Sequence, residues 1–136
     1  MKANQFTVVS KFDNGFIVQQ TKPGDTDLQW SHDLGRMTAG DAEKHVAKLD
    51  LGGFTDWRLP TVEELFLLAD RTKYGPAIDT ESFPDCRSDW YLTSSPDPSD
   101  PAYVFVVHFY HGYVDLSSRH YRFAVRAVRS VARASQ

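Results

Sequence analysis

The sequence predicts a single α+β domain that spans residues 1–136. Three observations predict this class: an alternating pattern with a turn signal near the N-terminus, two apolar stripes at helical spacing between residues 38 and 70, and only strand-like segments from Trp90 onward. Helices that precede a run of strands are typical of an α+β layout, here two helices packed on a mainly antiparallel sheet. With 41% hydrophobic residues and no internal repeat, the chain can bury one core.

The N-terminal part is predicted to form a β-hairpin. Residues 6–12 alternate between the two faces of a strand, and residues 16–20 give a second strand. The Asp-Asn-Gly sequence at 13–15 is a strong signal for the tight turn between them. A Pro-Gly pair at 23–24 marks another turn, and a short extended piece starts at residues 28–30.

Two helices are predicted in the first half of the chain. Thr38, with Asp41 three residues on, fits the N-cap of a first helix that runs to about residue 50. Its narrow apolar stripe consists of Ala42, Val46 and Leu49. The second helix runs from Thr61 to about residue 70, and its apolar face consists of Val62, Leu65, Phe66 and Ala69.

The joint between these helices reads GGFTDWRLPTVEEL at residues 52–65. Its two glycines suit the left-handed cap that ends a helix. Pro60 keeps the residues before it extended, and Thr61 and Glu64 have the spacing of a capping box. We interpret this joint as a packed structural crossing.

The polar residues of the joint are therefore interpreted as structural rather than catalytic. Trp57 is expected to pack inside, because burying an indole is strongly favourable, and Arg58 is expected to pair with a carboxylate. Arg126 and Arg129 are expected to form an ion pair with Asp56 or Glu64, although a regular strand cannot point both arginines inward. The structural set consists of Asp56, Trp57, Arg58, Pro60, Thr61, Glu64, Trp90, Arg126 and Arg129.

Residues 74–86 are predicted to be irregular, and the strands of the second half start at Trp90. Three prolines and the polar residues between them, at 96–101, predict an exposed loop that cannot join a sheet ladder. Residues 102–110 are apolar on both alternations, so we expect a central strand covered on both faces.

The last two strands follow a short turn. His111 and Gly112 allow a tight turn into a strand at 113–116. Residues 123–131 are predicted as the closing strand, which places the end of the chain beside the N-terminal strands.

The joint also carries a resemblance to a known family. The run GGFTDWRLPTVEEL resembles the signature of the DUF1566 family, also called Lcl C-terminal-like domains. WYLTSS at 90–95 and RAVR at 126–129 resemble two later segments of that family, so the likeness covers roughly residues 28–130. The resemblance implies a C-type-lectin-like fold, a scaffold used more for binding than for catalysis.

The most unusual composition lies at residues 108–113 (HFYHGY) and 119–122 (RHYR). Tyr, His and Arg supply contact area with few rotatable bonds and a polar tip, as in antibody paratopes, and the resemblance places the ligand face in this late region. The alternative is that half of these aromatics are core and the rest decorate a hairpin. The predicted binding residues are Tyr91, Tyr103, His108, Tyr110, His111, Tyr113, Arg119, His120, Tyr121 and Arg122.

No metal ion or other cofactor is predicted. The candidate ligands are His108, His111, His120 and Asp115, but strand alternation points residues 108 and 111 to opposite faces unless the chain turns at His111. For calcium, the aspartates at 97, 100 and 115 supply oxygen atoms, but the E-P-N ligand motif of calcium-binding lectins is absent. The single cysteine, Cys86, excludes an intramolecular disulfide and is expected to be unreactive.

Charge and hydropathy exclude two classes of partner. The net charge of −3 lacks the basic footprint of a nucleic-acid-binding protein. No run approaches the ~20 apolar residues of a membrane span. The N-terminus has no leader pattern, which predicts a cytoplasmic protein, or an extracellular one if an export signal lies upstream of this sequence.

The sequence thus predicts a non-enzymatic binding module whose ligand is a protein partner, by analogy in a phage or host-interaction setting. The alternative is a carbohydrate-binding or adhesin-type domain for sulfated polysaccharide, which the family resemblance implies. A metal-dependent enzyme built on the three late histidines is the less favoured hypothesis. An exposed aromatic hairpin also suits a homo-oligomer interface.

Overall fold

The computed structural model describes residues 5–13, 15–21, 24 and 26–132. The predicted turns at 13–15 and 23–24 each contain one residue, Asn14 and Pro23, that lies outside this range. No helix in the described ranges has the length and apolar composition that crossing a membrane requires.

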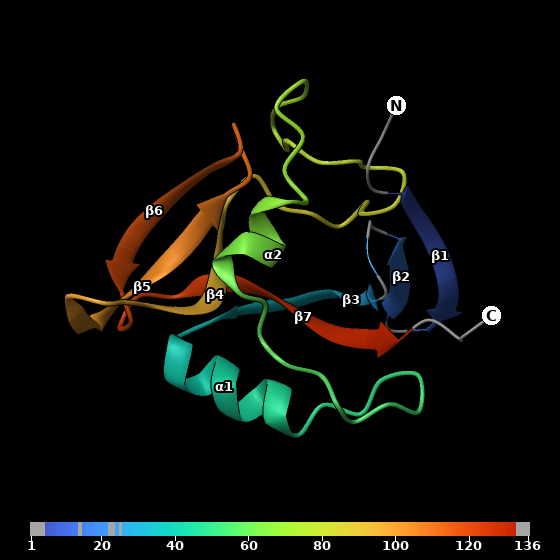
Figure 1. The fold of residues 1–136 in the computed structure, drawn as a ribbon, viewed down its shortest axis with the longest axis horizontal. Coiled ribbons are helices and arrows are strands. Elements are labelled where there is room, and N and C mark those ends of the chain that lie inside the picture. The colour runs from blue at the N-terminus through green and yellow to red at the C-terminus, as the bar shows by residue number, and fades with distance from the viewer. Residues whose placement is uncertain (1–4, 14, 22–23, 25, 133–136) are drawn as a thin grey trace.

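A seven-stranded sheet forms the centre of the domain (Figure 1). Its spatial order is β1-β2-β3-β7-β4-β5-β6, so the last strand of the chain lies in the middle. Neighbouring strands are antiparallel except β4 and β7, which pair in parallel at Tyr91 and Ala124. The strands are β1 (Gln5–Phe12), β2 (Gly15–Thr21), β3 (Thr26–Met37), β4 (Trp90–Asp97), β5 (Asp100–His108), β6 (Tyr113–Ser118) and β7 (Phe123–Ala132).

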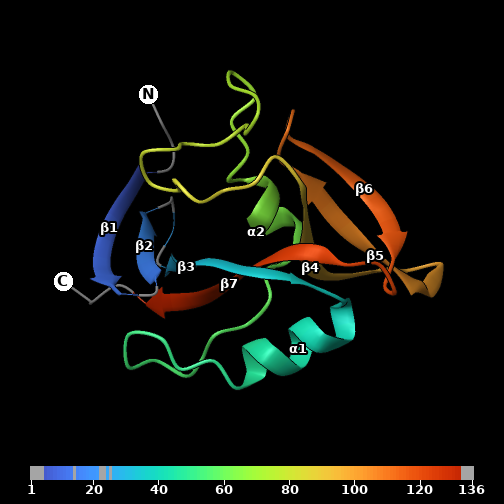
Figure 2. The same cartoon turned by 180° about the vertical axis from the view of Figure 1, so that it is seen from behind.

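The two helices lie on opposite faces of this sheet. Figures 1 and 2 show α1 (Ala39–Ala47) on one side of the β3–β7 pair and α2 (Val62–Phe66) on the other. Each face has its own core, and β7 contributes to both because its side chains alternate. Phe123, Val125 and Ala127 belong to the core on the α1 side, whereas Ala124 and Val128 belong to the core on the α2 side. This arrangement confirms the predicted α+β class and suits a C-type-lectin-like fold.

Several elements differ in length from the prediction. The N-terminal hairpin is confirmed, but β3 continues through twelve residues rather than ending as a short piece. Thr38 caps α1 as predicted and accepts a hydrogen bond from the Asp41 N–H, although the helix ends at Ala47 rather than near residue 50. The five-residue α2 ends at Phe66 instead of near residue 70, and a turn continues its apolar face to the buried Leu68.

The prediction that Gly52 and Gly53 end the first helix is wrong. Both have a positive φ, 64° and 83°, as expected for a two-residue turn of the hairpin type. Leu51 and Phe54 flank this turn and exchange two backbone hydrogen bonds of 3.1 Å. The glycines therefore close a miniature hairpin after the helix has ended.

The prediction of a loop outside the sheet at 96–101 is also wrong. Pro96 pairs with Val104, and Asp97 pairs with Asp100, so the strands continue to a tight turn. Prolines are tolerated here because β4 pairs with β7 only near Tyr91, which leaves the far part of β4 without a strand on that side. The pairing also shifts register on either side of Pro96. In β5, Val104, Val106 and Val107 are buried as predicted, whereas Tyr103 is exposed.

Residues 57–61, which we call the crossing segment, fill the space where β4 and β7 diverge. Arg58 exchanges two backbone hydrogen bonds of 2.9 Å with Val128 of β7. On the other side, the Pro60 carbonyl accepts a 2.8 Å hydrogen bond from the Ser94 N–H of β4. The segment thus carries the chain from the α1 face to the α2 face, which confirms the predicted packed crossing.

The capping box at the start of α2 gives a first testable prediction. The Thr61 hydroxyl accepts from the Glu64 N–H at 3.2 Å, and the Glu64 carboxylate accepts from the Thr61 N–H at 2.9 Å. Replacing Thr61 with alanine is expected to lower the free energy of unfolding by about 1 kcal/mol, which urea denaturation measures. Thr61→Ser keeps the acceptor and is the control. An equal loss in both variants would contradict the capping role.

Candidate functional site

A cluster of six rings surrounds the turn between β5 and β6. We call it the aromatic face; its members are Tyr74, Trp90, His108, Tyr110, His111 and Tyr113. The turn is closed by the Gly112 N–H, which donates to the His108 carbonyl at 3.0 Å. Gly112 has a φ of 81°, and a Cβ there would lie 3.2 Å from Ala69, so this position favours glycine.

The rings contact one another in two groups. His108 stacks on Tyr113 with a centroid distance of 5.4 Å, and both meet the Trp90 ring edge-on, at 4.4 and 5.5 Å. Tyr74 stacks on His111 at 6.2 Å and contacts Tyr110 at 6.0 Å. Tyr74 is 71% exposed, Tyr110 42% and Tyr113 44%, so the cluster presents aromatic surface to solvent.

Backbone hydrogen bonds fix the loop that carries Tyr74 against the hairpin turn. The Gly75 N–H donates to the Tyr110 carbonyl at 2.8 Å, and the Ala77 N–H donates to the Phe109 carbonyl at 2.6 Å. Phe109 and Ala77 are themselves buried. The backbone that carries the exposed rings is therefore fixed by hydrogen bonds, which lowers the loss of conformational entropy when a partner binds.

His108 is a neutral imidazole at neutral pH. Its Nδ1 accepts a 3.0 Å hydrogen bond from the Tyr110 N–H, which requires that this nitrogen carry no proton. Burial lowers the pKa of His108; the nearby Asp89 carboxylate opposes this effect, and His111 adds to it. Among the described residues, no group of three or more His, Cys, Asp or Glu side chains is arranged to hold a metal ion.

A second group of predicted binding residues lines a hollow of about 680 Å³, which we call the Arg36 hollow. Trp90 lines it as well, so the hollow and the aromatic face share one indole. Arg36 forms an ion pair with Asp89 and donates to the Arg122 carbonyl at 3.3 Å. The predicted binding residues that line the hollow are His120, Tyr121 and Arg122.

Three predicted binding residues lie elsewhere. Tyr91 is 1% exposed, so its assignment to a binding surface is wrong; its hydroxyl donates to Asp33 at 2.5 Å and accepts from the Arg87 N–H. Tyr103 is exposed but pairs with Ser118, at the opposite end of the hairpin from the aromatic face. Arg119 points to α1, where it forms a 3.0 Å ion pair with Glu43.

Several contacts predicted for the structural set are present. Trp57 is buried, with its indole N–H 3.3 Å from the Leu51 carbonyl, and Arg58 donates to both carboxylate oxygens of Glu64 at 2.7 and 2.8 Å. The predicted pair of Arg129 and Asp56 is present, at 2.6 and 3.2 Å. The hydrogen bond from Arg129 is the main reason that the pKa of Asp56 is lowered.

Arg126 differs from its prediction, because its partner is neither Asp56 nor Glu64. Its side chain points to the α2 face, is 2% exposed and forms a 3.0 Å ion pair with Asp85. Its guanidinium also donates to the Ser31 carbonyl at 2.8 Å and lies over the Phe83 ring at 5.1 Å. Because side chains alternate along a strand, Arg126 and Arg129 point to opposite faces of the sheet, as the sequence predicted.

The thiol beside this arginine gives a second testable prediction. Burial raises the pKa of Cys86 to about 11, with the Arg126 charge opposing it. Because the thiolate is the nucleophile, we expect iodoacetamide to modify the folded protein far more slowly than the urea-unfolded protein at about pH 7.5. Mass spectrometry measures both rates. Equal rates would show that the thiol is not protected.

Sequence reasoning assigned three residues of this region to no binding surface. Tyr74 and Arg36 were not predicted as site residues, and Trp90 was assigned only a structural role. Tyr74 and Arg36 lie far in sequence from the residues that they contact, His111 and Asp89. Local sequence patterns do not predict such contacts. The Gly75-Pro76 pair predicted a turn after Tyr74, but no local pattern indicated that the Tyr74 ring would contact Tyr110 and His111.

Comparison with known protein families identifies the family of this chain. The model of the Lcl C-terminal domain family, also known as DUF1566, matches residues 19–129, which is most of the chain. Curated proteins give no match. The match contains the complete crossing segment, the Arg58–Glu64 pair and the aromatic face. The chain belongs to the Lcl C-terminal domain family.

Proposed function

We propose that this domain is a non-enzymatic binding module that recognises a protein partner through the aromatic face. The observation that carries the proposal is the exposure of Tyr74, Tyr110 and Tyr113 on a backbone that hydrogen bonds hold in place. Tyrosine is enriched in binding hot spots, because it supplies large apolar area and a polar tip at low entropic cost. The neutral His108 ring stacks against Tyr113 and adds no charge to the surface there.

Affinity capture from a native lysate tests this proposal. The face variant is Tyr74→Ala/Tyr110→Ala/Tyr113→Ala, and the matched control removes similarly exposed apolar groups elsewhere, as Val9→Ala/Leu67→Ala/Tyr103→Ala. We expect wild type and control to retain the same protein and the face variant to lose it. Circular dichroism checks that all three proteins are folded.

One result would count against the proposal, and another would identify the partner as a second copy of this domain. If the face variant captures the same partner as wild type, the aromatic face is not the binding surface. If no protein is captured but sedimentation shows concentration-dependent dimers that the face variant abolishes, the partner is a second copy of this domain. We further propose that the interaction takes place in the cytoplasm, and fractionation of the native cells tests that compartment.

Carbohydrate recognition is a second candidate, which the Arg36 hollow favours. A concave site with aromatic residues and a few polar groups is typical of small-ligand binding. Here Trp90 and Tyr121 supply the rings, and Arg122, His120 and Asp115 supply polar groups. We expect Arg122→Ala/His120→Ala to abolish binding on a glycan array while leaving protein capture unchanged. Loss of protein capture in this variant would instead extend the partner surface into the hollow.

A further inference from the structure

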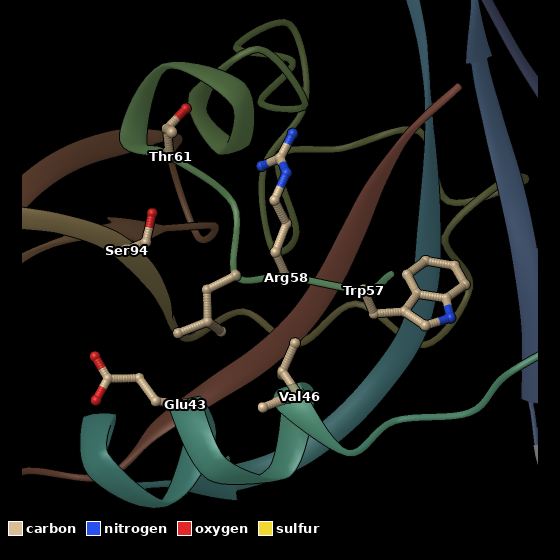
Figure 3. Close-up of a pocket in the computed structure, with 8 residues that line it drawn as sticks. Glu43, Val46, Trp57, Arg58, Thr61 and Ser94 are labelled. Atoms are coloured by element: carbon tan, nitrogen blue, oxygen red, sulfur yellow. The ribbon is translucent and has the colours of Figure 1, made fainter. Parts of the chain in front are cut away.

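A separate hollow of about 590 Å³ lies between α1 and the crossing segment, and we call it the α1 pocket (Figure 3). Its lining residues come from α1, from the crossing segment and from Ser94 of β4. Neither the residues of the aromatic face nor those of the Arg36 hollow line it. Its size falls within the range of small-molecule sites, roughly 300–1,000 Å³.

The wall of the α1 pocket is apolar. Val46 rises from α1 toward the crossing segment (Figure 3), and Leu59 and Trp57 of that segment also line the pocket. Each of these side chains is buried. Ala47, the last residue of α1, also lines the pocket and is exposed, so no larger side chain fills the space there.

The charged groups at the rim already have partners. Glu43 pairs with Arg119 at 3.0 Å, and Arg58 donates to both oxygens of Glu64. A charged ligand would have to compete with these pairs, so the rim does not favour one. A neutral ligand leaves both pairs intact.

Two hydroxyl groups remain available at the rim. The Thr61 oxygen accepts the Glu64 N–H, which leaves its own O–H to donate. The Ser94 backbone N–H is used by Pro60, whereas no partner within the described part of the chain engages the Ser94 hydroxyl. The two hydroxyls belong to Thr61, beside α2, and to Ser94, on β4, both across the pocket from α1 (Figure 3). They can bond one polar group of a ligand whose apolar body lies against Val46 and Leu59.

We propose that the α1 pocket is a second binding site, which takes an uncharged small molecule with a ring-sized apolar body and one hydroxyl or carbonyl group. The site does not depend on the proposed partner recognition, because it shares no residue with the aromatic face. Its recognition has two parts: the apolar wall excludes water around the body of the ligand, and Ser94 with Thr61 orients its polar group.

NMR titration with p-cresol and toluene tests the site on the intact domain. These probes share an apolar ring and differ by one hydroxyl. We expect p-cresol to bind saturably and to shift the backbone amide signals of Val46, Ala47, Leu59 and Ser94. Ala47→Leu fills the pocket with a good helix former and is expected to weaken p-cresol binding by about tenfold or more. Ala102→Leu, at an exposed position of β5, is the control and should bind as wild type does.

A second variant separates the polar contact from the apolar wall. In wild type we expect p-cresol to bind more tightly than toluene, and in Ser94→Ala we expect this preference to shrink while toluene binding is unchanged. Signals that shift only at the aromatic face would overturn the site, as would equal binding of p-cresol by wild type and Ala47→Leu. Failure here leaves the capture experiment unaffected, since that experiment tests other residues.

Discussion

Replacing Arg126 with methionine is expected to lower the free energy of unfolding by about 3–5 kcal/mol, the usual result of removing one partner of a buried ion pair. Arg126 is 2% exposed, and its guanidinium satisfies Asp85 and the Ser31 carbonyl together. Methionine fills much of the same volume, so the loss arises chiefly from a carboxylate and a carbonyl left without their donor. Urea denaturation followed by tryptophan fluorescence measures it.

The companion variants identify the source of that loss. The double variant Arg126→Met/Asp85→Asn is expected to be more stable than Arg126→Met alone, because it no longer leaves an unpaired carboxylate in a partly buried place. Arg122→Met replaces an exposed arginine in the segment before β7 and is expected to change stability by less than about 0.5 kcal/mol. A wild-type unfolding curve for Arg126→Met would show that the ion pair contributes nothing.

Replacing Trp57 with alanine is expected to cost about 3–5 kcal/mol of the free energy of unfolding. The indole is 4% exposed, packs in the core on the α1 side and bonds to the Leu51 carbonyl. Its removal leaves a cavity at the point where the crossing segment meets α1. Thermal unfolding measures the loss, which should be smaller for Trp57→Phe because most of the packing remains.

Tyr74→Ala is the matched control for this cavity, since it truncates an aromatic residue that is 71% exposed. We expect its midpoint of thermal unfolding to stay close to that of wild type. If the two alanine variants unfold at the same temperature, the crossing segment is not a packed part of the core.

The parts of the fold that local chemistry specifies were predictable. The alternation of residues 6–12, the Thr61–Glu64 capping box and the extended backbone before Pro60 all depend on neighbours within a few residues. The end of α1 was not predicted correctly, because the helix stops at Ala47 without a glycine cap. The glycines that suggested a cap, Gly52 and Gly53, form a separate turn further along the chain. The strand ends at 96–97 and 100–101 were missed because proline tolerance depends on which edge of β4 lacks a neighbour.

Prediction of the site was limited in the same way, because local patterns do not specify contacts between residues far apart in sequence. The composition of residues 108–113 and 119–122 predicted a binding surface in this region, but it could not separate the aromatic face from the Arg36 hollow. Tyr91 was misassigned because strand alternation alone does not say which face is covered, and the loop that covers it, with Phe83 and Asp85, is irregular. Arg126 and Asp85 are 41 residues apart, and no local pattern pairs them.

The position of β7 in the sheet affects how the protein can be synthesised. The strands β1–β3 form one side of the sheet and β4–β6 the other, and β7 lies between them. While the ribosome is still making the chain, neither group of strands can join the other, because the strand that links them is translated last. The domain should therefore complete its fold only after β7 has emerged, and the mainly non-local pairing predicts folding over milliseconds to seconds rather than microseconds. Until then, β3 and β4 each expose an unpaired edge, which makes the incomplete chain prone to aggregation.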